Sequence, residues 1–205
     1  MNYLGHAILS PEDDKMTVGN LAGDMLKNKF HPFLKEKVLS GVKLHRTIDS
    51  LTDSDPHFKK MLKYFRAEFG KYSPVVVDVL LDHLIAGHWT DLFAESYLDF
   101  STAVYRTVLR EKRELPPPVS GYMERMAEGK WMDAYGSESG MLRVFDRLSV
   151  KASKTLDGRS VMEIYGKNRA PIEGHFYAFL ESMRVRISEE AMGKKEVIPR
   201  IKWKN

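Results

Sequence analysis

Apolar positions along the chain recur with the period of an α-helix, about 3.6 residues, and seldom with the alternation of a β-strand. The clearest example has four large apolar residues on one helical face: Phe58, Leu62, Phe65 and Phe69. Asp55-Pro56 supplies an N-cap residue and a proline at the first helical position, and Gly70 supplies a helix end. The pattern therefore predicts a helix between Pro56 and Phe69.

The same signals predict helices along the rest of the chain. Ser73-Pro74 begins one that runs to about Trp89, and the prolines at 116–118 break the chain between two others. The remaining helices are expected at about Thr17–Lys27, Pro32–Ser40, Gly41–Leu51, Glu95–Arg113, Val119–Gly129, Gly140–Ala152 and Ile172–Met192. The sequence thus predicts an all-α fold, with one helical domain over 1–193 and a basic tail over 194–205.

Composition narrows the class of protein. The chain has 205 residues, of which 43% are hydrophobic and 29% charged, and these values are ordinary for a globular domain. It has no cysteine, which excludes disulfides, thiolate metal ligands and thiol nucleophiles and fits a reducing compartment. The first nine residues lack the pattern of a signal peptide, and no apolar run approaches the roughly 20 residues of a membrane helix. We therefore expect a cytoplasmic protein with no membrane association.

The net charge of +4 is confined to one end of the chain. Residues 194–204 carry five basic side chains against Glu196 alone, while the rest of the chain has 27 basic and 27 acidic residues. A nucleic-acid-binding protein usually spreads basic groups over a folded surface, so nucleic acid is not expected as a partner. The tail is either a solvated terminus or a segment that attracts an acidic protein.

Three ionisable residues interrupt the most apolar predicted helix, VVVDVLLDHLI at 75–85. Aliphatic residues surround this helix on all sides, which is typical of a buried helix. Asp78 and Asp82 are four residues apart, about 40° around the helix, so both carboxylates project from one face, and His83 flanks that face. Two carboxylates in an apolar setting are costly to ionise unless a cation compensates them.

The sequence nearby offers no such cation, because no Lys or Arg occurs between Lys71 and Arg106. For a single buried aspartate, an ion pair with a distant arginine or a capping hydrogen bond is the commoner explanation. Two aspartates and a histidine at this spacing favour a metal ion, and these ligand types suit Mg²⁺ or Mn²⁺.

Other segments offer further ligands. His45 and Asp49 lie at i, i+4 in GVKLHRTIDSLTDS, so both project from one face of a predicted helix. Taken alone, they are best explained as a solvated pair on a helix surface. Taken with Asp78, Asp82 and His83, they predict the second wall of one metal site. Asp24 in GNLAGDMLK is a third candidate because it follows glycines that permit close backbone approach, and the alternative is an ordinary polar position in a short helix. His6, in the apolar segment MNYLGHAIL, is more often a buried core histidine than a ligand.

These segments resemble a known family. MNYLGHAILS, GNLAGDMLK, GVKLHRTIDSLTDSDP and DVLLDHLIAGHW occur in the order of the conserved blocks of the acyl carrier protein phosphodiesterases, across residues 1–95. Beyond about Phe100 the resemblance is looser, and it does not extend to the tail. Gly5, Met25-Leu26 and Asp55 depart from the family pattern. None of these departures removes a proposed ligand, but Asp55 stands where the family has a histidine, so no role for a histidine is expected there.

The resemblance implies a helical fold distantly similar to HD-domain phosphohydrolases, with Mn²⁺ or a similar ion, Mg²⁺ being the alternative. It also implies the hydrolysis of holo-acyl carrier protein, an acidic protein, to the apo-protein and 4′-phosphopantetheine. Carried over by position, the acidic and histidine residues of the family's blocks are Asp24, His45, Asp49, Asp78, Asp82 and His83.

Further roles follow as hypotheses. His83 or His6 is a candidate acid or base for the departing serine alkoxide, and Arg46 is a candidate clamp for the phosphate. Two other functions are consistent with the sequence: an HD-type hydrolase of nucleotides or another small phosphoester, and a carrier-protein-binding module without catalysis. The absence of P-loop, GxGxxG, GxSxG and HExxH patterns leaves serine-based and nucleotide-cradling chemistry without a motif.

Overall fold

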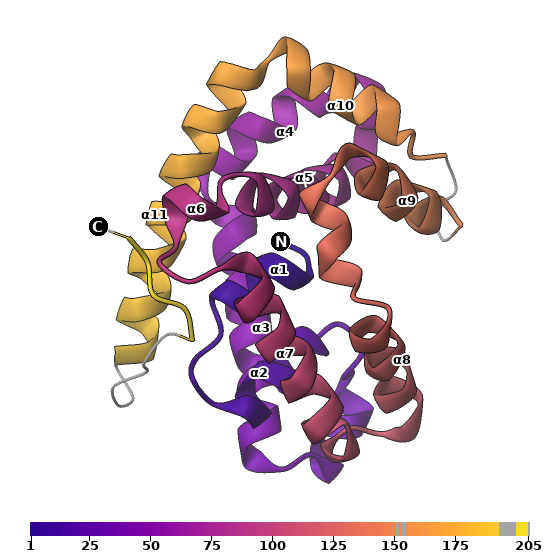
Figure 1. Ribbon diagram of the computed structural model, residues 1–205, viewed down its shortest axis with the longest axis vertical. Coiled ribbons are helices and arrows are strands. Elements are labelled where there is room, and N and C mark those ends of the chain that lie inside the picture. The colour runs from indigo at the N-terminus through magenta and orange to yellow at the C-terminus, as the bar shows by residue number, and fades with distance from the viewer. Residues whose placement is uncertain (151, 153–154, 193–199, 205) are drawn as a thin grey trace.

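The computed structural model describes residues 1–150, 152, 155–192 and 200–204. Within these ranges the chain forms one all-helical domain without strands, which confirms the predicted fold class (Figure 1). The α-helices are α1 (Tyr3–Ile8), α2 (Asp14–Leu21), α3 (Glu36–Ser54), α4 (Pro56–Phe69), α5 (Ser73–Gly87), α6 (Trp89–Leu92), α7 (Tyr97–Glu111), α8 (Pro117–Glu128), α9 (Glu138–Ser149), α10 (Gly158–Lys167) and α11 (Arg169–Met192). Short 3₁₀ helices lie between some of them: η1 (Asn28–Phe33), η2 (Gly70–Tyr72), η3 (Lys112–Glu114) and η4 (Trp131–Gly136).

Helix α4 has the limits that its sequence predicts. The buried Asp55 carboxylate accepts hydrogen bonds from the backbone N–H groups of His57 and Phe58, and Pro56 occupies the first position of the helix. Gly70 ends the helix with φ of +52°, in the left-handed region that favours glycine. Local capping chemistry therefore determines both ends.

Helix α3 is continuous where the sequence predicted two helices separated near Gly41. A Cβ on Gly41 would lie 2.1 Å from the carbonyl oxygen of Met16, and a Cβ on Gly19 would lie 2.1 Å from that of Val38. The two glycines thus allow the backbones of α2 and α3 to touch. The prediction of a break was wrong because Gly41 serves this close crossing and does not end a helix.

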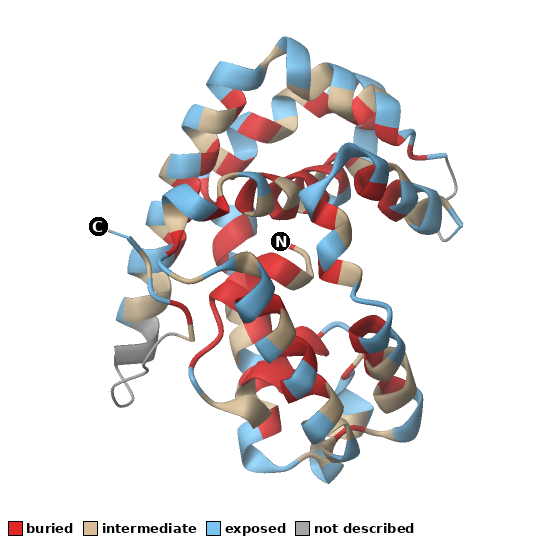
Figure 2. Cartoon of the chain, in the orientation of Figure 1, coloured by how far each residue is buried: buried red, intermediate tan, exposed pale blue. Residues whose placement is uncertain are grey.

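Helix α5 forms the centre of the core, as its all-round apolar sequence predicted. It contacts α1, α4 and η4, and Figure 2 shows that most of its residues are buried. Its buried aliphatic residues are Val76, Val77, Val79, Leu80, Leu81, Leu84 and Ile85.

The short helix α1 joins the two halves of the molecule. In Figure 1 the N-terminus lies near the middle, with α4, α5, α9 and α10 above it and α2, α7 and α8 below it, while α11 runs along the left edge past both groups. Helix α1 contacts both α5 and α2, and α3 contacts α2 as well as α4 and α11. The start of the chain is therefore enclosed by segments that are distant in sequence.

Only part of the predicted basic tail can be placed, because residues 194–199 lie outside the described ranges. Arg200 is paired with Asp14 at 2.8 Å, and its backbone N–H donates to the carbonyl of Ser10. Ile201 is buried, and Trp203 packs edge-on against Phe93. Residues 200–204 are therefore docked on the domain.

None of the helices in the described ranges combines the length and the apolar character that crossing a membrane requires.

Candidate metal site

A cavity of about 340 Å³ opens beside the N-terminus, where α1, the end of α2, α3 and α8 meet. Its walls carry both polar and apolar groups: Met1, Asn2, Tyr3, His6, Leu21, Asp24, Met25, His45 and Tyr122. A cavity of this size is within the range of sites for small molecules or for the extended arm of a larger substrate.

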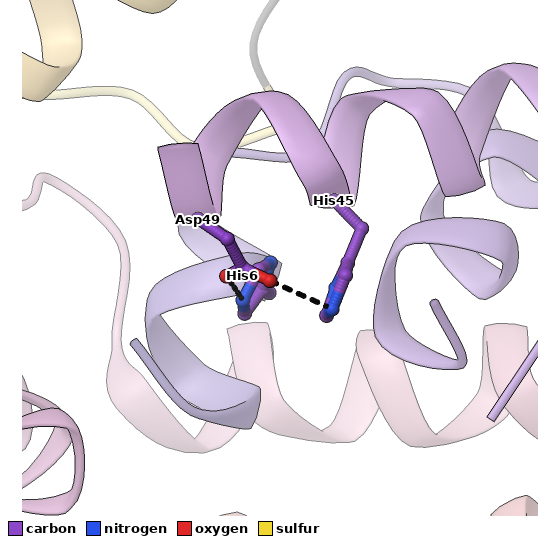
Figure 3. A group of neighbouring side chains, drawn as sticks. All are labelled: His6, His45 and Asp49. Atoms are coloured by element: carbon purple, nitrogen blue, oxygen red, sulfur yellow. Dashed lines mark ion pairs between the residues drawn. The ribbon is translucent and has the colours of Figure 1, made fainter. Parts of the chain in front are cut away.

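Three side chains beside this cavity could bind one metal ion: His6, His45 and Asp49. One ligand atom from each lies within 4.8 Å of the others. His45 and Asp49 are one turn apart on α3 and project toward His6 from α1 (Figure 3). The rings of His6 and His45 are stacked, with centroids 4.2 Å apart.

Buried polar atoms normally have hydrogen-bond partners, but several ring nitrogens of these two histidines have none. In the described part of the chain, Nε2 of His6 and both ring nitrogens of His45 are buried without a hydrogen-bond partner. The Asp49 carboxylate lies 3.3 Å from His6 Nε2 and 3.2 Å from His45 Nε2, and Asp24 lies 3.4 Å from His45 Nε2. Buried nitrogens without hydrogen bonds, directed toward carboxylates, fit a site for a divalent cation.

The charges at the site depend on one another. Burial opposes the charge on His45, but contacts with Asp24 and Asp49 outweigh it and raise the pKa of His45 to about 9. The pKa of Asp24 is lowered, chiefly by His45, and that of Asp49 is lowered by both histidines against the effect of burial. Burial lowers the pKa of His6. The site therefore combines two carboxylates, a neutral His6 and, without metal, a protonated His45.

Gly23 allows this arrangement to form. A Cβ on Gly23 would lie 2.3 Å from Cγ of His45, so any larger residue would displace the imidazole. Asp24 follows at the mouth of the cavity and is 85% exposed. The glycines in the segment GNLAGD thus bring α2 and the residues after it against the face of α3 that carries His45.

Asp78 and Asp82, which the sequence predicts as metal ligands, contact the N-terminal segment of the chain. The Met1 amino group lies 2.8 Å from Asp78 Oδ1, and the Asp82 carboxylate accepts hydrogen bonds from the backbone N–H groups of Asn2, Leu4 and Gly5. The positive charge comes from the amino terminus and from the N-terminal end of α1. Asp78 and Asp82 therefore have positive partners although the sequence between Lys71 and Arg106 contains no Lys or Arg.

His83 and Arg46 also contact other groups. His83 Nδ1 lies 2.7 Å from the carbonyl oxygen of Tyr135, and burial lowers its pKa. Arg46 donates to Asn28 Oδ1 at 2.8 Å and lines a separate surface hollow. Neither residue is among those that line the cavity.

Asp24, His45 and Asp49, which the sequence predicts as parts of one site, lie together in the structure. His6, which the sequence suggests as a core residue or an acid–base group, belongs to the potential ligand set. The only sequence signal for His6 was its place in a motif. The ion pair between the Met1 amino group and Asp78 could not be predicted from any side chain in the sequence.

The fold and the cavity together define an all-helical protein with a histidine–carboxylate site suited to a divalent cation. The sequence profile of the family described as acyl carrier protein phosphodiesterase matches residues 1–183. The chain therefore belongs to this enzyme family, and the match extends well beyond the motifs in residues 1–95.

Individual relatives agree with the profile. The acyl carrier protein phosphodiesterase of Pectobacterium atrosepticum is 31% identical over 155 residues, which cover 75% of this chain and 80% of the relative. Those of Enterobacter sp. strain 638 and Yersinia pestis are each 25% identical, over 94% and 89% of this chain and 100% and 95% of the relatives. No solved structure matches the fold, so similarity to HD-domain proteins stays a prediction.

Proposed function

We propose that the protein hydrolyses the phosphodiester bond of holo-acyl carrier protein and releases the apo-protein and 4′-phosphopantetheine, with the help of a divalent metal ion. Membership of the family supports the reaction and the substrate. The absence of cysteine fits a cytoplasmic location for this reaction.

One observation carries the metal dependence: buried histidine nitrogens without hydrogen bonds lie beside an ionised carboxylate at the edge of the cavity. We assign His6, His45 and Asp49 as ligands. Asp24 lies beside them at the cavity mouth, 3.4 Å from His45 Nε2. Two imidazole nitrogens suit Mn²⁺ better than Mg²⁺, which prefers oxygen ligands.

A divalent ion held by these residues supplies Lewis acidity toward a phosphate oxygen and lowers the pKa of water. Asp24 lines the cavity and has a lowered pKa, so its carboxylate is ionised and can orient an attacking water by accepting a hydrogen bond. His83 and Arg46 were the earlier candidates for proton transfer and phosphate binding. His83 contacts Tyr135, Arg46 contacts Asn28, and neither lines the cavity, so we give neither a role in the reaction.

The apolar side of the cavity provides a path for the phosphopantetheine arm. Tyr3 and Tyr122 each pack edge-on against Trp131, and Leu21 and Met25 complete this wall. We expect the arm to lie along this wall while the carrier protein stays outside, since the cavity holds an arm but not a folded domain.

The test is mass spectrometry of a holo-acyl carrier protein incubated with the metal-stripped enzyme, with and without added Mn²⁺. We expect the carrier protein to lose the mass of the arm only when Mn²⁺ is present. The variants Asp49→Ala and His45→Ala should lose this activity. The matched control is Asp53→Ala, which removes an exposed carboxylate one turn further along α3.

Two results would contradict the proposal. Turnover of a nucleotide panel without release of the arm would indicate a phosphohydrolase of small substrates. Binding of the carrier protein with no release under any metal would indicate a binding module.

A further inference from the structure

Asn20 contacts His6 and is not among the residues that line the cavity. It is fully buried on α2, and its Oδ1 is 2.9 Å from Nδ1 of His6. Its Nδ2 lies 2.9 Å from the carbonyl oxygen of His6 and 3.0 Å from Oγ of Ser10. Every polar atom of the Asn20 side chain is therefore engaged by the segment that carries His6.

These contacts fix the orientation of the amide. The His6 carbonyl oxygen can only accept a hydrogen bond, so the Asn20 atom facing it must be the NH₂ group. The Ser10 hydroxyl donates to the same carbonyl at 2.9 Å, which leaves its oxygen to accept the second Asn20 proton. The opposite orientation would place two oxygens against each other in a buried site. The other atom of the amide, Oδ1, is consequently the one that faces Nδ1 of the His6 ring.

The orientation of the amide in turn fixes the imidazole. An amide oxygen can only accept, so Nδ1 of His6 must carry a proton. In a neutral ring the proton on Nδ1 leaves Nε2 with its lone pair, and Nε2 is the atom that faces Asp49 without a hydrogen bond.

We propose that Asn20 is a positioning residue that holds His6 as the Nδ1–H tautomer and thereby presents the Nε2 lone pair to a metal ion. The assignment of the tautomer rests on the hydrogen bonds of Asn20 and Ser10 alone. Its consequence for metal affinity rests on the proposed function, since a hydrogen-bonded partner on the far nitrogen orients a histidine ligand.

The first test uses the wild-type chain, labelled with ¹⁵N at the histidine rings and stripped of metal, at neutral pH. NMR shifts and couplings of the ring nitrogens distinguish the two tautomers, and the variant His6→Gln identifies the signals of His6. We expect a protonated Nδ1 and an unprotonated Nε2. A protonated Nε2, or a cationic ring, would overturn the proposal whether or not the enzyme is metal-dependent.

The second test compares Asn20→Leu, which removes the acceptor, with Ser10→Ala, which leaves the Asn20 amide and its hydrogen bond to the His6 carbonyl in place. We expect Ser10→Ala to retain the Nδ1–H signal, and Asn20→Leu to lose it and to bind Mn²⁺ about 10- to 100-fold more weakly in calorimetry. The control Asn168→Ala removes a side-chain hydrogen bond to the Ile164 carbonyl at the end of α10, outside the site.

A merely structural role for Asn20 predicts something else: lower melting temperatures with an unchanged tautomer in both variants. That result would overturn the proposal. If the tautomer changes in Asn20→Leu while Mn²⁺ affinity stays equal to wild type, the link to the metal site is contradicted. If the wild-type tautomer is as expected but the enzyme shows no metal-dependent hydrolysis, the positioning role stands and the proposed function fails.

Discussion

The amino group of Met1 lies 2.8 Å from the Asp78 carboxylate, so the start of the chain is tied to the middle of α5. One turn later on α5, Asp82 holds three backbone N–H groups at the start of α1. Burial raises the pKa of Asp82 to about 7, against the opposing effects of the Met1 amino group and these N–H groups. Because α1 carries His6, these two aspartates position the site without lining its cavity.

Replacing Asp78 with asparagine is therefore expected to destabilise the fold. The buried Met1 ammonium would keep a neutral acceptor but lose its opposite charge. We expect a loss of about 2 kcal/mol in the free energy of unfolding, less than for a fully enclosed pair because Asp78 is partly exposed. Urea denaturation measures this loss. The control Asp53→Asn should leave stability within about 0.5 kcal/mol, and equal stability of both variants would contradict the role of Asp78.

Adding one methyl group at Gly23 should damage the site selectively. The new Cβ would lie within 2.3 Å of the His45 ring, so the imidazole must move. We expect Gly23→Ala to bind Mn²⁺ at least about tenfold more weakly and to lose a comparable factor in kcat. In Gly174→Ala the Cβ meets no atom within 4 Å, and this variant of α11 serves as the control. Full metal affinity in Gly23→Ala would show that the site tolerates a displaced His45.

Metal affinity should depend on pH through His45. Its pKa of about 9 in the metal-free protein means that an incoming ion must displace a proton below that pH. Affinity for Mn²⁺ is therefore expected to fall by about tenfold for each pH unit below 9 while Asp24 and Asp49 stay ionised. Calorimetry between pH 7 and 8 should also detect release of about one proton. An affinity that is constant over this range would exclude a protonated His45.

Stability without metal should change in the opposite direction. The pKa of His45 is raised on folding, so the proton stabilises the native state below the unfolded value of about 6.5. This contribution is lost as the pH rises through about 9. Urea denaturation of the metal-stripped protein at pH 6 and pH 9 would measure the difference, and in His45→Gln it should be smaller.

A basic segment next to the cavity mouth is a candidate docking site for the acidic carrier protein. Lys27 and Lys29 are exposed, and no acidic residue occurs between Asp24 and Glu36. We expect the double variant Lys27→Glu/Lys29→Glu to raise KM for the carrier protein by roughly fivefold with little change in kcat, and to weaken the dependence of KM on salt.

Two comparisons make this prediction specific. The exposed pair Lys60 and Lys63 on α4, which supplies no residue to the cavity wall, gives a matched charge reversal that should leave KM unchanged. Reversal of Lys194 and Lys195 tests the other docking candidate, the tail. A KM that responds only to the tail variant would assign docking to the tail and contradict a role for Lys27 and Lys29.

Several features of the protein follow from its sequence alone. The helical class and the limits of α4 do so because periodicity, the Asp55 cap and the positive φ of Gly70 act between residues a few positions apart. His45 and Asp49 were recognisable as a pair for the same reason, since one helical turn separates them.

Tertiary packing decided the rest. Gly41 looks like a helix end in the sequence, and only its contact with α2 shows that it serves a helix crossing. The partners of Asp78 and Asp82 are more than 70 residues away in sequence, at Met1 and on α1. His6 can be recognised as a potential metal ligand only from the structure, which stacks its ring on that of His45. The reason is physical: a helix and its caps are closed by local hydrogen bonds, whereas a counterion or a cavity forms where segments distant in sequence exclude water together.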